Sequence, residues 1–180
     1  MIMIYSLYIL NRAGGLIYQK DFNKGLKKIT TNDYLILSGI LHGVHAIASN
    51  ISPPSAIPST IYNNPSFTNT NKSGLKSIET DFFKMFIFQS LTGIKFVLIT
   101  SNNPISKEPE NINTSNPDSF SSSDISINRN INETESILRK IYALYSDYVM
   151  KNPFYSLEMP IRCDLFDLKL TDLIKSFSQP

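Results

Sequence analysis

The residues of this sequence with the most chemical potential are one cysteine and two histidines. Cys163 is the only cysteine, so no disulfide can form within the chain. Its thiolate could act as a nucleophile only beside a positioned histidine. Cys163 lies at the start of an apolar run with helical spacing, where a free cysteine is usually a small buried hydrophobe. We therefore interpret Cys163 as a structural residue.

His42 and His45 lie three residues apart and share one face of a predicted helix. A zinc site would need at least a third ligand, and the His-Glu-x-x-His pattern is missing. Glu79 and Asp81 flank the end of a predicted strand, where two carboxylates could share acid–base work, although nothing else in the sequence supports this and a solvated turn is the favoured interpretation. We predict no catalytic residue, no metal site and no cofactor.

Length and composition favour one soluble domain spanning 1–180. The formal charge of +2 gives no support for a nucleic-acid partner, which would require clustered Lys and Arg. The apolar start, 1–10, lacks the basic segment and cleavage site of a signal peptide. The apolar run 34–48 is shorter than the roughly 20 residues that span a membrane. We expect a cytoplasmic protein without a transmembrane segment.

The spacing of apolar residues predicts an α+β fold. Strands are predicted at 2–10 and 16–20, with two or three more within 74–100. Helices are predicted at 34–51, from about 133 to 151 and at 164–177, the first capped by Thr31 or Asp33. The order strand, strand, helix, three strands, helix, helix predicts a five-stranded antiparallel sheet flanked by helices.

Glycines and polar segments divide these elements. Gly14-Gly15 is followed by a strand and has no Lys-Ser/Thr after it, so it indicates a hairpin turn and not a phosphate loop. Residues 52–73 are rich in Pro, Asn and Ser and predict a flexible loop. Residues 101–132 keep no apolar period, so we expect a disordered insertion there.

The stretch 152–163, NPFYSLEMPIRC, is too apolar for an ordinary surface linker. It must pack against its own domain or against a partner, and both can hold if some side chains turn inward and others outward. Aromatic, Met and Arg side chains are favoured at the cores of interfaces. The candidate partner-binding residues are Phe154, Tyr155, Glu158, Met159, Pro160, Ile161 and Arg162.

Three motifs together, 13–19 (AGGLIYQ), 91–96 (LTGIKF) and 152–163, closely resemble the synbindin family, the fourth core subunit of the TRAPP vesicle-tethering complex. The resemblance implies a longin-like fold and a non-catalytic role. It also implies support of guanine nucleotide exchange on a Rab1/Ypt1-type GTPase in ER-to-Golgi and Golgi vesicle transport. The implied partners are the other TRAPP core subunits and that GTPase. The implied location is peripheral, at the Golgi and at ER–Golgi vesicles.

The sequence departs from the family in two respects and leaves other functions open. The Asn/Ser-rich stretch 101–132 is longer than the family's usual short link at that place. Animal members carry a PDZ-like insertion between the hairpin and the first helix, where only residues 21–32 stand here, so functions of that insertion are expected to be absent. A longin-type adaptor or small coat chain is the alternative. A SNARE should continue into heptads and an anchor, and the chain ends at Pro180 with neither. A small enzyme using Cys163 or the histidines lacks partner residues.

Overall fold

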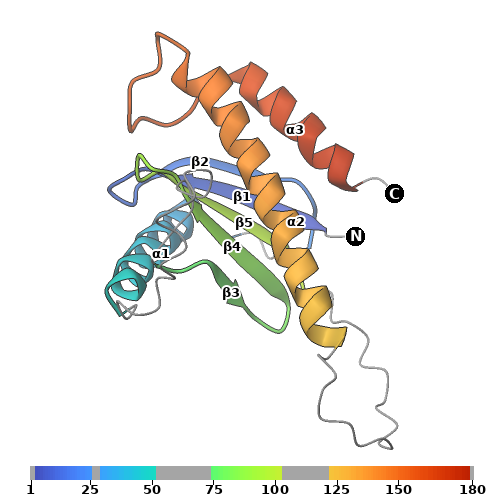
Figure 1. Ribbon diagram of the computed structural model, residues 1–180. Helices are drawn as coiled ribbons and strands as arrows, with labels where there is room; N and C mark the ends of the chain where they lie inside the picture. Colours follow the sequence, from blue (N-terminus) through green and yellow to red (C-terminus); the bar gives the residue numbers. More distant parts are fainter. Residues whose placement is uncertain (1–2, 26–28, 52–73, 103–121, 179–180) are drawn as a thin grey trace, which may run out of the picture.

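The computed structural model describes residues 3–25, 29–51, 74–102 and 122–178, with only the backbone for 122–131 and 178. The elements are β1 (Ile4–Leu10), β2 (Leu16–Asp21), α1 (Thr31–Ile51), β3 (Ser77–Glu79), β4 (Phe83–Gln89), β5 (Lys95–Ser101), α2 (Ser122–Leu144), a π-helix (Tyr145–Met150) and α3 (Asp164–Ser178). They confirm the predicted fold class, a five-stranded antiparallel sheet with helices (Figure 1). The expected loop at 52–73 lies outside the described residues.

The sheet has the strand order β2-β1-β5-β4-β3, and every neighbouring pair is antiparallel. Side chains of β5 alternate between its two faces, with Phe96 and Leu98 in one apolar core and Val97 and Ile99 in the other. β1 lies between β2 and β5, as predicted for a strand covered on both faces. A strand buried on both faces reads as a continuous apolar run, which is why 4–10 lacks polar alternation.

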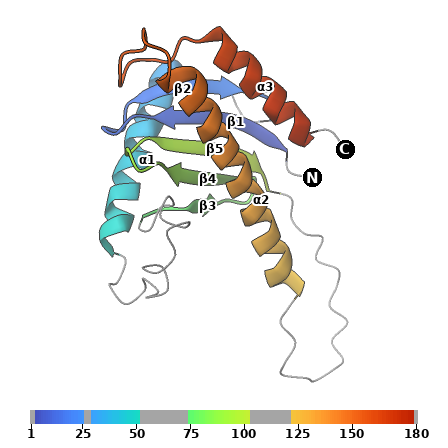
Figure 2. The ribbon, with the colours of Figure 1, turned by 45° about the horizontal axis from the view of Figure 1, so that its top comes forward.

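Helices cover the two faces unequally. α1 lies on one face, while α2 and α3 lie on the other (Figure 2). On the second face Phe96 contacts the rings of Tyr142 and Tyr145, with centroids 5.9 and 5.4 Å apart. Aromatic pairs in such edge-on geometry add stability beyond the area that they bury. The larger of the two cores therefore forms between the sheet and the C-terminal helices.

α1 begins with a reciprocal cap. The hydroxyl of Thr30 donates to Asp33 Oδ2 at 2.8 Å, and the backbone N–H of Asp33 donates to Thr30 Oγ1 at 3.3 Å. The N-cap is therefore Thr30, and neither predicted residue, Thr31 nor Asp33, holds that position itself. Asp33 bonds backward from the third helical position, as in a capping box, and the two predicted caps lie one and three residues after the observed one.

One apolar stripe of α1 faces away from the sheet. Its buried residues are Tyr34, Ser38, Leu41 and His45. The exposed ones include Ile36, Ile40, Val44, Ile47 and Ile51, which are 43% to 73% exposed. These five recur at intervals of three and four, so they form one stripe along the helix. This outer stripe is the most extended exposed apolar feature of α1.

α1 is also longer than its apolar run indicated. It has 21 residues, and among the described helices it is the one long and apolar enough to cross a bilayer. One side of it carries Ser38, His42 and His45 and packs on the sheet. The absence of a transmembrane segment stays a prediction, which this packing supports because a helix lying on a sheet does not span a bilayer.

α2 begins at Ser122 and not near Glu133, so the expected disorder of 101–132 is wrong for its last part. Ile127 and Ile131 lie four residues apart and continue the apolar spacing of the helix upstream. The many Asn and Ser residues around them, which have low helix propensity, concealed that spacing. Ser101 belongs to β5, and 103–121 lie outside the described residues.

α3 is attached to the edge strand β2 through Asp167. The hydroxyl of Tyr18 donates to Asp167 Oδ1, and Lys20 Nζ lies 3.6 Å from the same oxygen. Lys20 and Thr171 also donate to the backbone carbonyl of Asp167, at 3.1 and 2.7 Å. Burial, followed by Asp167, raises the pKa of Tyr18. The hydroxyl therefore remains a hydrogen-bond donor at neutral pH.

Asp167→Ala should lower the free energy of unfolding by about 1 kcal/mol, because Tyr18 then keeps a hydroxyl that has lost its acceptor. Urea unfolding followed by circular dichroism measures the change. Asp172→Ala is the matched control, since Asp172 is an exposed carboxylate on the same helix. Equal losses for the two variants would contradict the anchoring role of Asp167.

Candidate functional site

The candidate partner-binding residues lie on one loop, 152–163, between the π-helix and α3 (Figure 1). The structure separates the larger apolar side chains of this loop, Leu157 and Cys163 included, into two groups. Phe154, Leu157 and Met159 point into solvent, with exposed fractions of 94%, 65% and 58%. Ile161 is buried, and Tyr155 and Cys163 are partly buried against the same core. The inward packing expected for part of this stretch is therefore present, and partner binding by the exposed side chains stays a prediction.

The inward group fastens the loop to the sheet. The backbone N–H of Ile161 donates to the carbonyl of Ile17 at 2.8 Å, which occupies part of the free edge of β2. The thiol of Cys163 lies 3.8 Å from the carbonyl of Tyr148. Cys163 thus packs as a small apolar residue, as interpreted from the sequence. The loop is part of the fold and not a free linker.

The loop also has internal hydrogen bonds. The hydroxyl of Tyr155 donates to the carbonyl of Met159 at 2.9 Å, and the N–H of Met159 donates to the carbonyl of Ser156 at 3.2 Å. Asn152 Oδ1 accepts from the N–H of Phe154 at 3.1 Å, as in an Asx turn. Glu158 adopts a left-handed backbone, with φ of 70°. Together these contacts hold Leu157 and Met159 outward.

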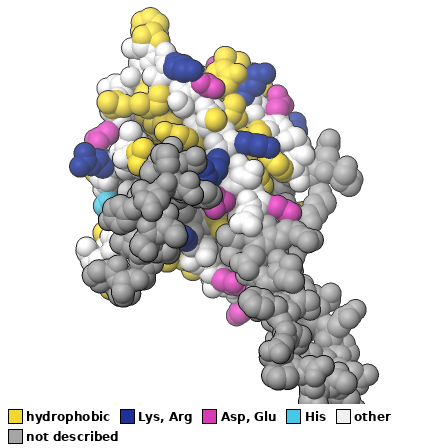
Figure 3. Space-filling model, viewed as in Figure 1, with side chains coloured by type: hydrophobic (Ala, Val, Ile, Leu, Met, Phe, Trp, Pro, Cys, Tyr) yellow, Lys and Arg dark blue, Asp and Glu magenta, His cyan; other side chains and the backbone are white. Residues whose placement is uncertain are grey.

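The remaining candidates, Glu158, Pro160 and Arg162, are exposed. Among the described residues, neither Glu158 nor Arg162 forms an ion pair with another side chain. Hydrophobic side chains gather at the top of Figure 3, where the loop lies in Figure 1, with single basic and acidic side chains beside them. This mixture of apolar tip and sparse charge is typical of a protein-binding surface.

The π-helix sets where the loop begins. Tyr145 and Val149 are both buried, and Asn152 N–H donates to the carbonyl of Val149 at 3.2 Å. Burial, followed by the neighbouring Tyr155, raises the pKa of Tyr145 to about 12. Its buried hydroxyl lies beside Tyr155. Single π-turns within helices are rare and often lie at functional sites.

The two histidines lie between α1 and the ends of the strands. His45 contacts Gln89 through Nε2, and a methyl group added to Gly14 would lie 2.6 Å from His42 Cγ. Lys95 is 5% exposed, and its Nζ donates to the carbonyl of Gly93 at 3.4 Å. Burial, followed by Lys95 and then His45, lowers the pKa of His42. Within the described ranges, no three His, Cys, Asp or Glu side chains could hold a metal ion.

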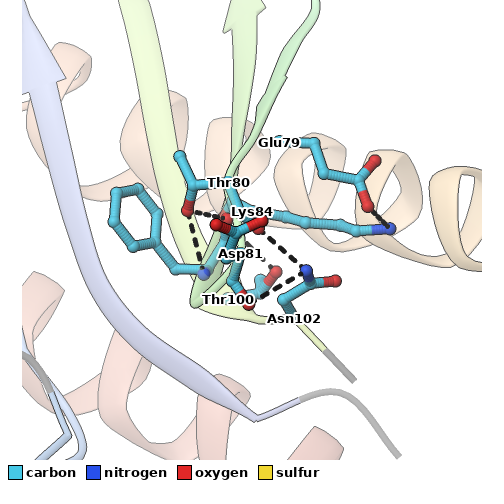
Figure 4. A network of polar contacts seen from close by, with 7 residues as sticks. Glu79, Thr80, Asp81, Lys84, Thr100 and Asn102 are labelled. Carbon is cyan, nitrogen blue, oxygen red and sulfur yellow. Dashed lines mark hydrogen bonds and ion pairs between the residues drawn. The ribbon is translucent and has the colours of Figure 1, made fainter. Parts of the chain in front are cut away.

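Of the two carboxylates considered for acid–base work, Glu79 ends β3 and Asp81 lies in the turn that follows (Figure 4). Glu79 forms an ion pair with Lys84 at 2.8 Å. Asp81 accepts through its backbone carbonyl from Asn102 Nδ2, which donates more closely to Thr80, at 2.8 Å. The ion pair joins β3 to β4, and the Asn102 hydrogen bonds connect the β3–β4 turn to the end of β5. They favour the solvated-turn interpretation over acid–base work.

Sequence inspection noted the apolar residues of α1 but could not tell which of them face outward. The stripe Ile36, Ile40, Val44, Ile47 and Ile51 is a second candidate surface. Gly43 lies next to it, and a methyl group there would meet no atom within 4 Å. Small residues beside an apolar stripe allow close approach of another backbone. No Lys or Arg occurs in 31–51, which disfavours an anionic membrane as the contacting surface.

The lowered pKa of His42 makes stability depend on pH. The folded chain binds fewer protons than the unfolded chain, so its stability should be complete above about pH 6.5 and should fall as the pH decreases through that value. Thermal unfolding between about pH 7.5 and pH 5.5 measures this. His42→Gln should reduce the dependence, with His45→Gln as the matched comparison. An unchanged slope in His42→Gln would contradict the assignment.

Comparison with known proteins identifies relatives along nearly the whole chain. The Sybindin-like family model matches residues 4–114 and 125–177. A Dictyostelium discoideum protein named trafficking protein particle complex subunit 4 is 40% identical over 171 residues, which cover 95% of this chain and 96% of the relative. The Bos taurus protein of the same name is 36% identical over 153 residues, 85% of this chain but 51% of the relative.

A second kind of relative matches over a similar length. The Dictyostelium discoideum protein named trafficking protein particle complex subunit 1 is 27% identical over 177 residues, covering 96% of this chain and 95% of that relative. The lower identity places it further from this chain than the subunit 4 relatives. The resemblance inferred from the three motifs is confirmed, and the chain belongs to the Sybindin-like family.

Proposed function

We propose that this chain is a non-catalytic core subunit of a TRAPP complex. The chain matches a relative named as subunit 4 at 40% identity over 95% of its length, which supports this proposal. In this proposal it supports guanine nucleotide exchange on a Rab1/Ypt1-type GTPase in ER-to-Golgi and Golgi transport. It would lie in the cytoplasm, peripherally attached to Golgi and ER–Golgi vesicles through the complex.

The exposed stripe of α1 carries the proposal on the structural side. Five large apolar side chains between Ile36 and Ile51 lie on the outside of a helix whose other face already packs on the sheet. Contiguous apolar surface of this kind marks an interaction site in soluble proteins. A subunit covered by neighbours in an assembly would bury it permanently. Proteins that function alone seldom keep such a stripe in water.

Nucleotide exchange does not require proton transfer or a nucleophile. A protein accelerates release when it binds the nucleotide-free GTPase more tightly than the loaded form, because binding then shifts the population toward the empty state. Shape and differential contacts are sufficient for this. A subunit whose histidines, cysteine and carboxylates are engaged in packing and turns fits such a role.

Charge on the outer stripe of α1 should weaken assembly without unfolding the chain. Ile40→Asp and Ile47→Asp replace side chains that are 57% and 61% exposed, so the isolated domain should keep its melting temperature. Binding to the other core subunits should weaken by about tenfold or more, as for a charge placed within an apolar interface. Ala46→Asp, exposed on the same helix but off the stripe, is the control. Normal assembly of both stripe variants would contradict this use of α1.

Release of fluorescent GDP tests the functional part of the proposal. The core subunits of the same species are assembled with and without this chain and mixed with their Rab1-type GTPase. We expect fast release only when the chain is present, because it completes the assembled exchange surface. Assembly without any effect on release would refute a contribution to exchange. Failure of the chain to join the core at all would favour the adaptor or coat-chain alternative.

A further inference from the structure

The tip of the 152–163 loop is a second apolar surface, separate from α1. Phe154, Leu157 and Met159 together expose a ring, a branched chain and a thioether within six residues of sequence. Phe154 is 94% exposed, so it contributes almost nothing to the core of its own domain. Side chains that stay in water do not gain the stabilisation that burial of apolar area provides, so these three do not stabilise the fold. Their exposed position is better explained by a contact with another molecule than by the stability of this domain.

The loop is already ordered before any partner binds. Both of its ends are fastened, by Asn152 to Val149 at the start and by Ile161 to Ile17 near the finish. Between them the Tyr155 hydroxyl bonds across the loop to Met159. Ordering side chains and loops is a principal cost of association, and a loop fixed in advance avoids most of it. The tip therefore has the character of a preorganised anchor.

The charges around the tip select the kind of partner. Glu158 and Arg162 are exposed, opposite in sign and, within the described part of the chain, outside any ion pair. A loop that inserts into an anionic membrane carries an excess of Lys and Arg, and the balance here does not provide one. Permanent interfaces have apolar centres, whereas transient ones are more polar. The tip fits a protein that remains bound.

We infer that Phe154, Leu157 and Met159 insert into an apolar pocket of a neighbouring subunit that stays bound, while Glu158 and Arg162 orient the contact against opposite charges. The inference rests on the proposed role as a subunit of a larger assembly. It adds a second interface, at the end of the sheet where β2 begins and away from the outer stripe of α1. The chain would then be held by two different surfaces.

Affinity for the core assembled without this chain tests the inference. Phe154→Ala should weaken binding by about 30-fold or more, as expected for a buried aromatic anchor, with the melting temperature of the isolated chain unchanged. Phe82→Ala is the matched control. Phe82 is 83% exposed on the β3–β4 turn, at the opposite end of the strands, and its replacement should leave binding unchanged. Arg162→Glu should also weaken binding, and more at low salt.

The outcomes separate the inference from the proposed function. If the wild-type chain does not join the core, the proposed function fails. If the wild-type chain joins and Phe154→Ala joins equally well, the loop inference is overturned and the proposed function stands. Equal weakening by Phe82→Ala would also overturn it. Flotation with vesicles of phosphatidylcholine and phosphatidylserine, if it required Phe154, would assign the tip to lipid and reject a subunit pocket.

Discussion

The fold depends on one constraint, that the central strand β5 must be kept from water on both of its faces. Phe96, Val97, Leu98 and Ile99 are each at most 4% exposed, and successive residues belong to opposite cores. A sheet with two apolar faces needs a cover on each. The apolar composition of β5 therefore explains why helices lie on both faces of the sheet. The larger cover, from α2 and α3, also carries the loop.

The two covers leave different surfaces exposed. On one face a single described helix, α1, contributes Tyr34, Ser38, Leu41 and His45 to the packing, a partly polar set. Its more apolar residues are consequently available for a contact outside the chain. On the other face the aromatic cluster around Phe96 fixes the end of α2, and this end positions the loop. Each layer of the domain thus presents one apolar surface, in a different direction.

Much of the fold could be predicted from local patterns, because strands and turns leave short-range signals. Gly14 has a positive φ at the hairpin turn that was predicted from Gly14-Gly15. The start of α2 could not be predicted, since Asn and Ser obscure the spacing of Ile127 and Ile131. The side of α1 that faces the sheet also could not be predicted from the sequence. Both sides of that helix contain apolar residues, and the choice depends on packing partners distant in sequence.

The candidate surface was predictable in composition but not in orientation. The apolar character of 152–163 marked it, yet Ile161 turns inward and Phe154 outward for reasons that involve Ile17, in another part of the chain.

The π-helix has a consequence for this loop. Each residue of an α-helix rotates the chain by about 100° around the helix axis. The wider turn at Tyr145–Met150 therefore determines the direction, around that axis, in which the chain leaves the helix. Removing a single residue there would rotate the loop around the side of the molecule, and the same twelve residues would then face a different neighbour.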